Sequence, residues 1–143
     1  MTTDTIHPTD TDPTDTDHTV HGGPRALLRV EGLLVLAAAI AAYFHLDGGW
    51  GWLAGLFLLP DVALAAYLAG PRVGAVAYNA AHSYIGPALL AAVGLGLGGL
   101  GSPLVLGALI WVAHVGFDRA LGYGLKHASG FRDTHLGRVG KAS

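Results

Sequence analysis

Long apolar runs alternate with short breaks along this chain. Each of four runs is close to the roughly 20 residues that an α-helix needs to cross about 30 Å of hydrocarbon. The runs cover Ala26–Leu46, Trp50–Ala69, Val73 to about Leu97, and Leu104–Leu125. The connections between them are short and contain Gly and Pro. Because short connections make sequential helices antiparallel neighbours, the pattern predicts an all-α fold, a four-helix transmembrane bundle of up-down-up-down topology.

Polar sequence flanks this apolar region at both ends. Residues 1–24 are rich in Thr, Asp, Pro and His, a composition that cannot bury enough surface to offset the entropy of ordering. We therefore expect a disordered Asp/Thr-rich tail over 1–24, the four-span bundle over 25–126 and a basic cytoplasmic tail over 127–143. The second tail either anchors at the anionic membrane surface or folds as a lid that brings Thr134 and His135 over a site in the bundle.

The composition agrees with a membrane protein. Hydrophobic residues make up 52% of the 143 residues and charged residues 13%, and the mean hydropathy is +0.48. Such a chain is too apolar for an ordinary soluble domain, so we expect the lipid bilayer as its partner and no nucleic acid. The sequence has no cysteine, which excludes disulfides, thiolate metal sites and a cysteine nucleophile.

Basic residues gather on one side of the predicted topology, the side that holds both termini and the connection at Gly70–Arg72. They are Arg25, Arg29, Arg72, Lys126, Arg132, Arg138 and Lys141. The other side holds no Lys or Arg. Because cytoplasmic loops carry an excess of basic residues, the pattern predicts a multi-pass protein of the inner (cytoplasmic) membrane with both termini in the cytoplasm.

Polar side chains interrupt the four apolar runs at similar depths. A rise of about 1.5 Å per residue gives depths from the cytoplasmic end of about 9 to 13 Å for Glu31, Asn79, Asp118 and Asp61, and about 15 to 18 Å for His82 and His114. Ionisable groups at membrane depth are costly unless they are paired or line a cavity. The matched depths therefore predict one polar site in the cytoplasmic half of the bilayer.

Local spacing adds to this prediction. His114 and Asp118 are four residues apart and share one face of a helix, as do Arg119 and Tyr123. Pro60 directly precedes Asp61, and a proline within a span bends the helix, as helices do beside cavities.

The chemistry that such a site favours is general acid–base catalysis. A carboxylate that is dehydrated in a bilayer has a raised pKa, and histidine titrates near neutrality. We predict isomerisation, cyclisation or hydrolysis of a lipophilic small molecule. The predicted catalytic residues are Asp61, His114, Asp118 and Glu31, and the predicted substrate-binding residues are Asn79, His82, Arg119 and Tyr123.

Three other functions remain open. His82, His114 and carboxylates could hold zinc or iron across the bundle, but no tight H-x-x-x-H or E-x-x-H pair occurs and Arg119 adjoins the site, so we expect no metal and no cofactor. Proton, ion or small-molecule transport would need an oligomer, because four helices enclose little lumen. A structural or partner-binding role is the third, and small residues spaced four apart, such as Gly51 and Gly55 or Gly94 and Gly98, allow either packing within the chain or homodimerisation.

Motifs in the last third of the chain carry a resemblance. The segment from His114 to Lys126 reads H-x-G-F-D-R-x-x-G-Y-G-L-K, and Asp133–Gly137 reads D-T-H-L-G. Together with Pro60-Asp61, Tyr78-Asn79 and His82, they resemble a family of small bacterial four-helix membrane proteins known only as a domain of unknown function. The resemblance covers about residues 26–140. It implies a membrane fold and a bacterial source, and it assigns no activity, substrate or cofactor.

Overall fold

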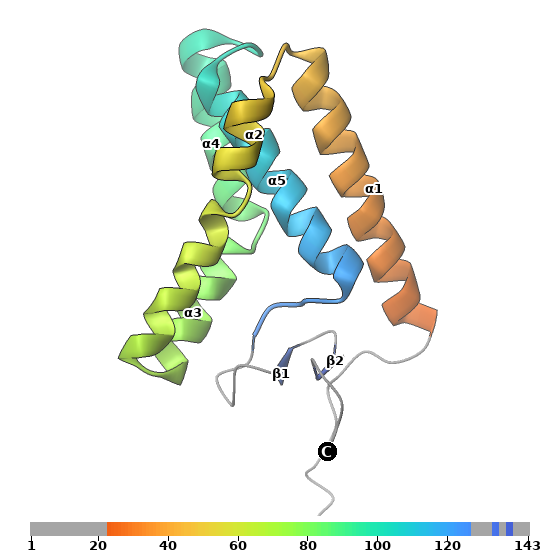
Figure 1. The fold of residues 1–143 in the computed structure, drawn as a ribbon, viewed down its shortest axis with the longest axis vertical. Coiled ribbons are helices and arrows are strands. Elements are labelled where there is room, and N and C mark those ends of the chain that lie inside the picture. The colour runs from red at the N-terminus through yellow and green to blue at the C-terminus, as the bar shows by residue number, and fades with distance from the viewer. Residues whose placement is uncertain (1–22, 127–132, 135–136, 139–143) are drawn as a thin grey trace, which may run out of the picture.

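The computed structural model describes residues 23–126, 133–134 and 137–138, and within these ranges the chain is almost entirely helical (Figure 1). The elements are α1 (Gly23–His45), α2 (Trp50–Leu56), the 3₁₀ helix η1 (Leu59–Ala69), α3 (Pro71–Ala81), α4 (Ile85–Gly98), α5 (Pro103–Leu121), β1 (Asp133–Thr134) and β2 (Gly137–Arg138). The predicted disordered tail lies almost wholly outside the described residues, as do His135 and most of the predicted basic tail.

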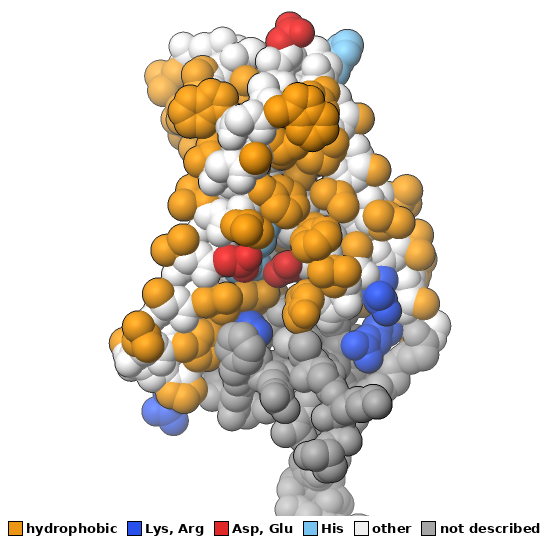
Figure 2. Space-filling view, viewed as in Figure 1, with side chains coloured by type: hydrophobic (Ala, Val, Ile, Leu, Met, Phe, Trp, Pro, Cys, Tyr) orange, Lys and Arg blue, Asp and Glu red, His pale blue; other side chains and the backbone are white. Residues whose placement is uncertain are grey.

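Several helices are long and apolar enough to cross a membrane. Gly23–His45, Trp50–Ala69 and Pro103–Leu121 each meet this condition, and α3 with α4 makes a fourth span if the bent pair is counted as one. Large hydrophobic side chains such as Leu34, Val76 and Leu97 are exposed on the helices, and Figure 2 shows hydrophobic side chains over most of one face. The predicted helical fold with several apolar helices of membrane-spanning length is confirmed, while the up-down-up-down order of four unbroken spans stays a prediction.

The best-packed pair of helices is α1 with α5, which lie side by side in Figure 1. Their backbones meet at two glycines. A Cβ on Gly32 would lie 2.8 Å from the backbone nitrogen of Ala120, and one on Gly116 would lie 2.8 Å from that of Leu36. Only glycine fits such a crossing, as in the close helix approaches known from membrane proteins. The remaining large contacts are α4 with α5 and η1 with α3.

The second and third predicted spans are both interrupted. Between Trp50 and Ala69 the winding changes from α-helix to 3₁₀ helix close to Pro60, and the amide of Asp61 bonds to the carbonyl of Leu58 instead of one residue earlier. Because proline has no N–H and its ring crowds the preceding turn, regular α-helical bonding stops there. An 11-residue 3₁₀ helix is unusually long, and such stretches often mark a functional hinge or a sequence under strain.

The third span divides between Ala81 and Ile85, and the axes of α3 and α4 differ by 41°. Pro87, near the start of α4, cannot donate to the carbonyl of Ser83, and this loss favours a kink or break at this point. The interruption frees the carbonyl of Ala81, which accepts a hydrogen bond of 2.6 Å from the indole Nε1 of Trp111 on α5. The sequence analysis predicted one unbroken span here and overlooked Pro87.

Helix α5 ends four residues earlier than the apolar pattern predicts. Gly122 has a φ of +93°, and the amide of Tyr123 bonds to the carbonyl of Asp118 at 2.8 Å. This is the glycine-terminated helix end that L-residues rarely form. Arg29 of α1 also donates through Nε to the carbonyl of Ala120. The chain after Gly122 therefore leaves the helix and runs toward α3 (Figure 1).

The segment after α5 is fixed by two hydrogen bonds to Asn79 of α3. The side-chain amide of Asn79 donates to the carbonyl of Lys126 at 2.9 Å, and the amide of Lys126 donates to Oδ1 of Asn79 at 2.7 Å. Lys126 also forms a β-bridge with Thr134, and β1 pairs with β2 in antiparallel register. Asn79 thus binds the chain itself.

The spaced small residues have different surroundings. A Cβ on Gly94 would lie 2.7 Å from Oγ of Ser102, so this glycine serves packing within the chain. Around Gly51 and Gly55 there is open space. Homodimerisation through the latter pair stays a prediction.

Candidate functional site

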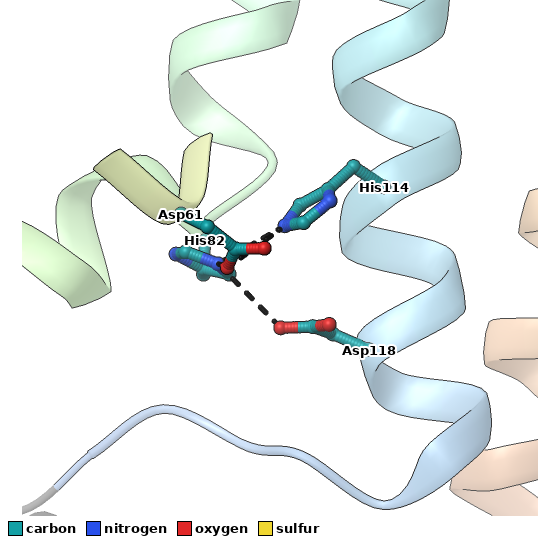
Figure 3. A group of neighbouring side chains, drawn as sticks. All are labelled: Asp61, His82, His114 and Asp118. Carbon is teal, nitrogen blue, oxygen red and sulfur yellow. Dashed lines mark hydrogen bonds and ion pairs between the residues drawn. The ribbon is translucent and has the colours of Figure 1, made fainter. Parts of the chain in front are cut away.

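Four ionisable side chains from three elements meet in the middle of the structure (Figure 3). Asp61 lies in the first turn of η1, His82 directly follows α3, and His114 and Asp118 lie on α5. Each offers one nitrogen or carboxylate oxygen, and these four atoms all lie within 4.8 Å of one another. We call these four residues the His–Asp cluster.

The contacts within the cluster centre on Nε2 of His82. This atom lies 3.1 Å from Nε2 of His114, 3.3 Å from Oδ1 of Asp61 and 3.5 Å from Oδ2 of Asp118. His114 Nε2 also lies 3.6 Å from Oδ1 of Asp61. The two histidines are buried, whereas the side chain of Asp61 is 37% exposed. Asp61 is therefore the member of the cluster that a ligand can reach most easily.

The interrupted helices explain how these side chains meet. His82 stands where α3 has ended, and its Nδ1 lies 3.0 Å from the carbonyl of Tyr78. Because a carbonyl only accepts hydrogen bonds, Nδ1 carries a proton and donates it there. In a neutral His82, Nε2 is then the unprotonated nitrogen and points at the cluster.

Tyr78 supports the cluster in two ways. Its hydroxyl donates to Oδ2 of Asp118 at 2.9 Å, and its ring stacks on the imidazole of His82 with 3.7 Å between centroids. The ammonium of Lys126 lies 4.6 Å from the centroid of the same ring. On another side, Phe57 packs edge-to-face against His114, with 5.4 Å between ring centroids. Rings thus restrict both imidazoles.

A cavity of about 330 Å³ adjoins the cluster. It is lined by Asp61, Asp118, Tyr78, Tyr123 and Lys126 together with the apolar side chains of Leu64, Phe117 and Leu121. Figure 2 shows acidic side chains, with a histidine behind them, bordered by hydrophobic side chains. The cavity has the size of a small-molecule site and combines apolar walls with a few polar groups, as such sites usually do.

A family model described as Domain of unknown function (DUF4260) matches residues 25–139. The chain belongs to this family. The matched segment includes the whole helical region and the D-T-H-L-G motif, in agreement with the resemblance seen in the sequence. Neither a curated protein nor a solved structure matches the chain.

The predicted site residues fall into three groups in this DUF4260 protein. Asp61, His82, His114 and Asp118 form the cluster, and Tyr123 lines the adjoining cavity. Arg119 lines a smaller hollow of about 10 Å³ beside His82 and Asp118, and its guanidinium lies 5.3 Å from the ring of Tyr84. The third group is Glu31 and Asn79, which lie outside the cluster.

Glu31 lies on the exposed surface of α1, a helix whose main partner is α5. It takes part in no hydrogen bond or ion pair among the residues that the structure describes. The second, third and fourth predicted spans therefore supply the cluster, and the first span does not.

Tyr78 and Lys126 are site residues that the sequence analysis did not assign. Tyr78 precedes His82 by four residues, so the shared helix face was a usable signal. Lys126 was counted as the end of the last span, and only the turn at Gly122 brings it beside the cavity. Burial lowers the pKa of Lys126 from its ordinary value, and the nearby carboxylates of Asp118 and Asp61 partly offset this effect.

Proposed function

We propose that this DUF4260 protein is a membrane enzyme that carries out acid–base chemistry on a lipophilic small molecule. The observation that carries the proposal is the contact of 3.1 Å between Nε2 of His82 and Nε2 of His114, beside a carboxylate that opens onto a cavity. Two buried imidazoles and a reachable carboxylate give a proton donor, a proton acceptor and a place for the substrate.

The direction of the hydrogen bonds suggests how protons are held. With Nδ1–H of His82 donating to Tyr78, Nε2 of His82 accepts from Nε2–H of His114 in the neutral pair. A proton that arrives at His82 Nε2 is then attracted by Asp61 Oδ1 at 3.3 Å. Asp61 exchanges the proton with the substrate, and Asp118, held by Tyr78, balances the charge of an imidazolium.

The walls of the cavity indicate the class of substrate. Leu64, Phe117 and Leu121 line it beside the two carboxylates, so the reacting molecule needs an apolar body and a polar or acidic C–H group. A molecule dissolved in the bilayer meets this description. Hydrolysis, isomerisation and cyclisation all remain compatible with such a site.

Orientation is part of the proposal. Arg25, Arg29 and Arg72 lie near the starts of α1 and α3, and Lys126 follows the end of α5. Figure 2 shows Lys and Arg side chains toward one end of the structure, and by the positive-inside rule we assign that end to the cytoplasm of a bacterial cell. A fluorescent protein fused to the C-terminus will fluoresce, and alkaline phosphatase at the same position will stay inactive. The opposite pair of results would reverse the orientation.

An isotope experiment tests the enzymatic proposal. Protein in lipid nanodiscs is incubated in ²H₂O with a lipid-soluble extract of bacterial cells, and mass spectrometry follows new or deuterated compounds. We expect wild type to convert or deuterate at least one compound, Asp61→Asn to lose this activity, and Asp47→Asn, an exposed carboxylate after α1, to keep it. An extract left unchanged by folded wild type would reject the proposal.

Transport is a second candidate, favoured by the two interrupted spans that meet at the cluster. Transporter sites are often built where helices are discontinuous, because the free helix ends present backbone polar groups to the cargo. Here Asp61 and His82 lie at two such interruptions. Proteoliposomes with an internal pH dye test this function: a proton flux that His114→Gln abolishes would favour transport, and tight liposomes would exclude proton conduction.

A further inference from the structure

We infer that the His–Asp cluster binds one divalent transition-metal ion, of the type of Zn²⁺ or Fe²⁺, through Asp61, His82, His114 and Asp118. The inference deepens the proposed function, and the catalytic use of the ion rests on that function. A catalytic site of this kind has three protein ligands and one water, so Asp61, the most exposed of the four, would give up its place to a water molecule. The pKa of that water would fall toward neutrality, and it would hold the proton that acid–base chemistry requires.

The separations within the cluster fit a metal ion. Zinc bonds to histidine nitrogen and carboxylate oxygen are about 2.0 to 2.2 Å long, which places neighbouring ligand atoms of a tetrahedral site about 3.3 to 3.6 Å apart. Four of the six separations among the ligand atoms are 3.1, 3.3, 3.5 and 3.6 Å, and all six are within 4.8 Å. One ion placed among these atoms reaches all four ligands with small adjustments of the side chains.

The hydrogen-bonding capacity of the cluster points to the same conclusion. Nε2 of His82 faces His114 Nε2, Asp61 Oδ1 and Asp118 Oδ2. In a neutral His82 this nitrogen offers only a lone pair, because the proton is at Nδ1, and the carboxylate oxygens also only accept. A single proton satisfies one of these contacts. A divalent cation satisfies all of them together.

Charge balance also favours a cation. Two carboxylates at membrane depth are costly when ionised, and a divalent ion neutralises both while the histidines stay neutral. The sequence analysis argued against a metal because Arg119 adjoins the site. In the structure Arg119 does line the small hollow beside His82 and Asp118, but its guanidinium lies 5.3 Å from the ring of Tyr84 and forms no ion pair with Asp61 or Asp118 among the described residues. Ligands from three elements replace the tight local pairs that the sequence lacks.

Outer contacts complete the resemblance to a metal centre. Ligand histidines usually donate their other N–H to a carbonyl or carboxylate, and ligand carboxylates usually accept further hydrogen bonds. His82 donates to the carbonyl of Tyr78, and Asp118 accepts from the hydroxyl of the same residue. His114 differs, because its buried Nδ1 makes no hydrogen bond of good geometry, although the backbone of Phe57 is close enough to interact with it.

Direct metal binding tests the inference without any substrate. Purified full-length protein without a polyhistidine tag is stripped with a chelator and titrated with Co²⁺, and the visible absorption and the metal content after desalting are measured. We expect about one Co²⁺ per chain with the strong absorption of a four-coordinate ion, and Zn²⁺ should displace it. His114→Gln and Asp61→Asn should each weaken binding more than the roughly 100-fold that outer contacts are worth.

Matched controls separate the cluster from other ligands. His45→Gln and Asp47→Asn change exposed residues at the far end of α1 and the turn after it, and they should bind Co²⁺ like wild type. Every variant keeps His7, His18 and His21, so binding by the N-terminal segment is the same throughout. Circular dichroism and gel filtration verify folding, and Tyr78→Phe, which keeps all four ligands, serves as a milder second variant.

The outcomes distinguish this inference from the proposed function. The inference is overturned if folded wild type binds no Co²⁺ or Zn²⁺, or if His114→Gln binds them as tightly as wild type. Conversion of the extract in the presence of chelator would then still support the enzymatic proposal. Stoichiometric binding without conversion of any compound supports the metal site and removes the enzymatic proposal.

Discussion

The unbroken helix α1 and the two interrupted spans of this protein differ in where their ionisable residues lie. Helix α1 is continuous over 23 residues and carries Glu31 on its exposed surface. The spans that contain η1 and α3 are interrupted, and each places an ionisable side chain of the cluster, Asp61 or His82, at its interruption. An ionisable residue within an apolar run thus predicts a site when the backbone around it is irregular.

Helix α5 joins the two regions. It packs against α1 through Gly32 and Gly116, and on another face it holds His114 and Asp118 toward the interruptions. Near the other end of α1, Tyr43, Leu53 and Ile110 form a buried hydrophobic core that contains no acidic, basic or histidine side chain. The α1–α5 pair is therefore the closely packed part of the fold, and the interrupted spans add Asp61 and His82 beside it.

Removing one ionisable residue from each region tests the difference between them most directly. General acid–base groups contribute about 10² to 10⁴ in rate, so Asp61→Asn should lower the turnover of any compound converted by wild type at least about 100-fold. Glu31→Gln, the matched change on α1, should leave the rate within about twofold. Equal losses in the two variants, measured in nanodiscs, would contradict the division between the regions.

A larger side chain at the contact between α1 and α5 tests whether close packing there stabilises the protein. Any Cβ at Gly116 would lie 2.8 Å from backbone atoms of α1, so Gly116→Val should push the helices apart and destabilise the protein by about 1 to 3 kcal/mol or more. Thermal unfolding in detergent measures the change. Gly51→Val is a control in open space on α2, and a similar loss there would indicate that helix propensity and not packing is responsible.

How far the sequence predicted this architecture differs between the two regions. Apolar length predicted the helical membrane fold, and depth along the chain placed Asp61, His82, His114 and Asp118 together, because both depend only on the regular rise of a helix. Depth does not specify direction around a helix, so Glu31 was included with the cluster although it lies on the exposed surface of α1.

The interruptions were harder to predict. Pro60 indicated a bend, but Pro87 lies within an apolar run and was overlooked. The carbonyl that this interruption frees, that of Ala81, accepts from Trp111 of α5, a contact between distant parts of the sequence. The turn at Gly122 was likewise hidden, because Leu121 and Leu125 continue the apolar pattern on both sides of it. The site of Lys126 follows from that turn and from Asn79, contacts that no local pattern contains.

Replacing Pro87 with alanine, which favours a helix, measures how much the interruption at His82 matters. In Pro87→Ala the new N–H can bond to the carbonyl of Ser83, which favours a continuous helix and turns His82 away from the cluster. We expect Co²⁺ affinity to fall about tenfold or more while the melting temperature stays equal or rises. Unchanged affinity would mean that packing against Trp111, and not the proline, sets the interruption.

A smaller effect is expected at the outer contacts of the cluster. Tyr78→Phe removes the hydrogen bond to Asp118 but keeps the ring that stacks on His82. Loss of one outer contact typically lowers metal affinity about 10- to 100-fold, and we expect the lower value because the ring remains. Tyr123→Phe, a change on the cavity wall, is the matched control. An unaltered Co²⁺ titration for Tyr78→Phe would show that Asp118 is oriented without its help.

The smallest expected effect concerns Lys126 and pH. Burial lowers the pKa of this lysine in the folded protein, so between the folded and unfolded pKa values the unfolded chain binds more protons, and stability rises with pH in that range. Below the folded pKa the ammonium is charged in both states and its burial cost is fully present. Lys126→Met, which keeps the length of the side chain, should therefore be more stable than wild type at pH 7, and the difference in melting temperature should shrink as the pH approaches about 10. A difference that stays constant over this range, or grows, would mean that Asp61 and Asp118 hold the ammonium more strongly than burial opposes it, and the lysine would then belong to the charge balance of the cluster and not only to the wall of its cavity.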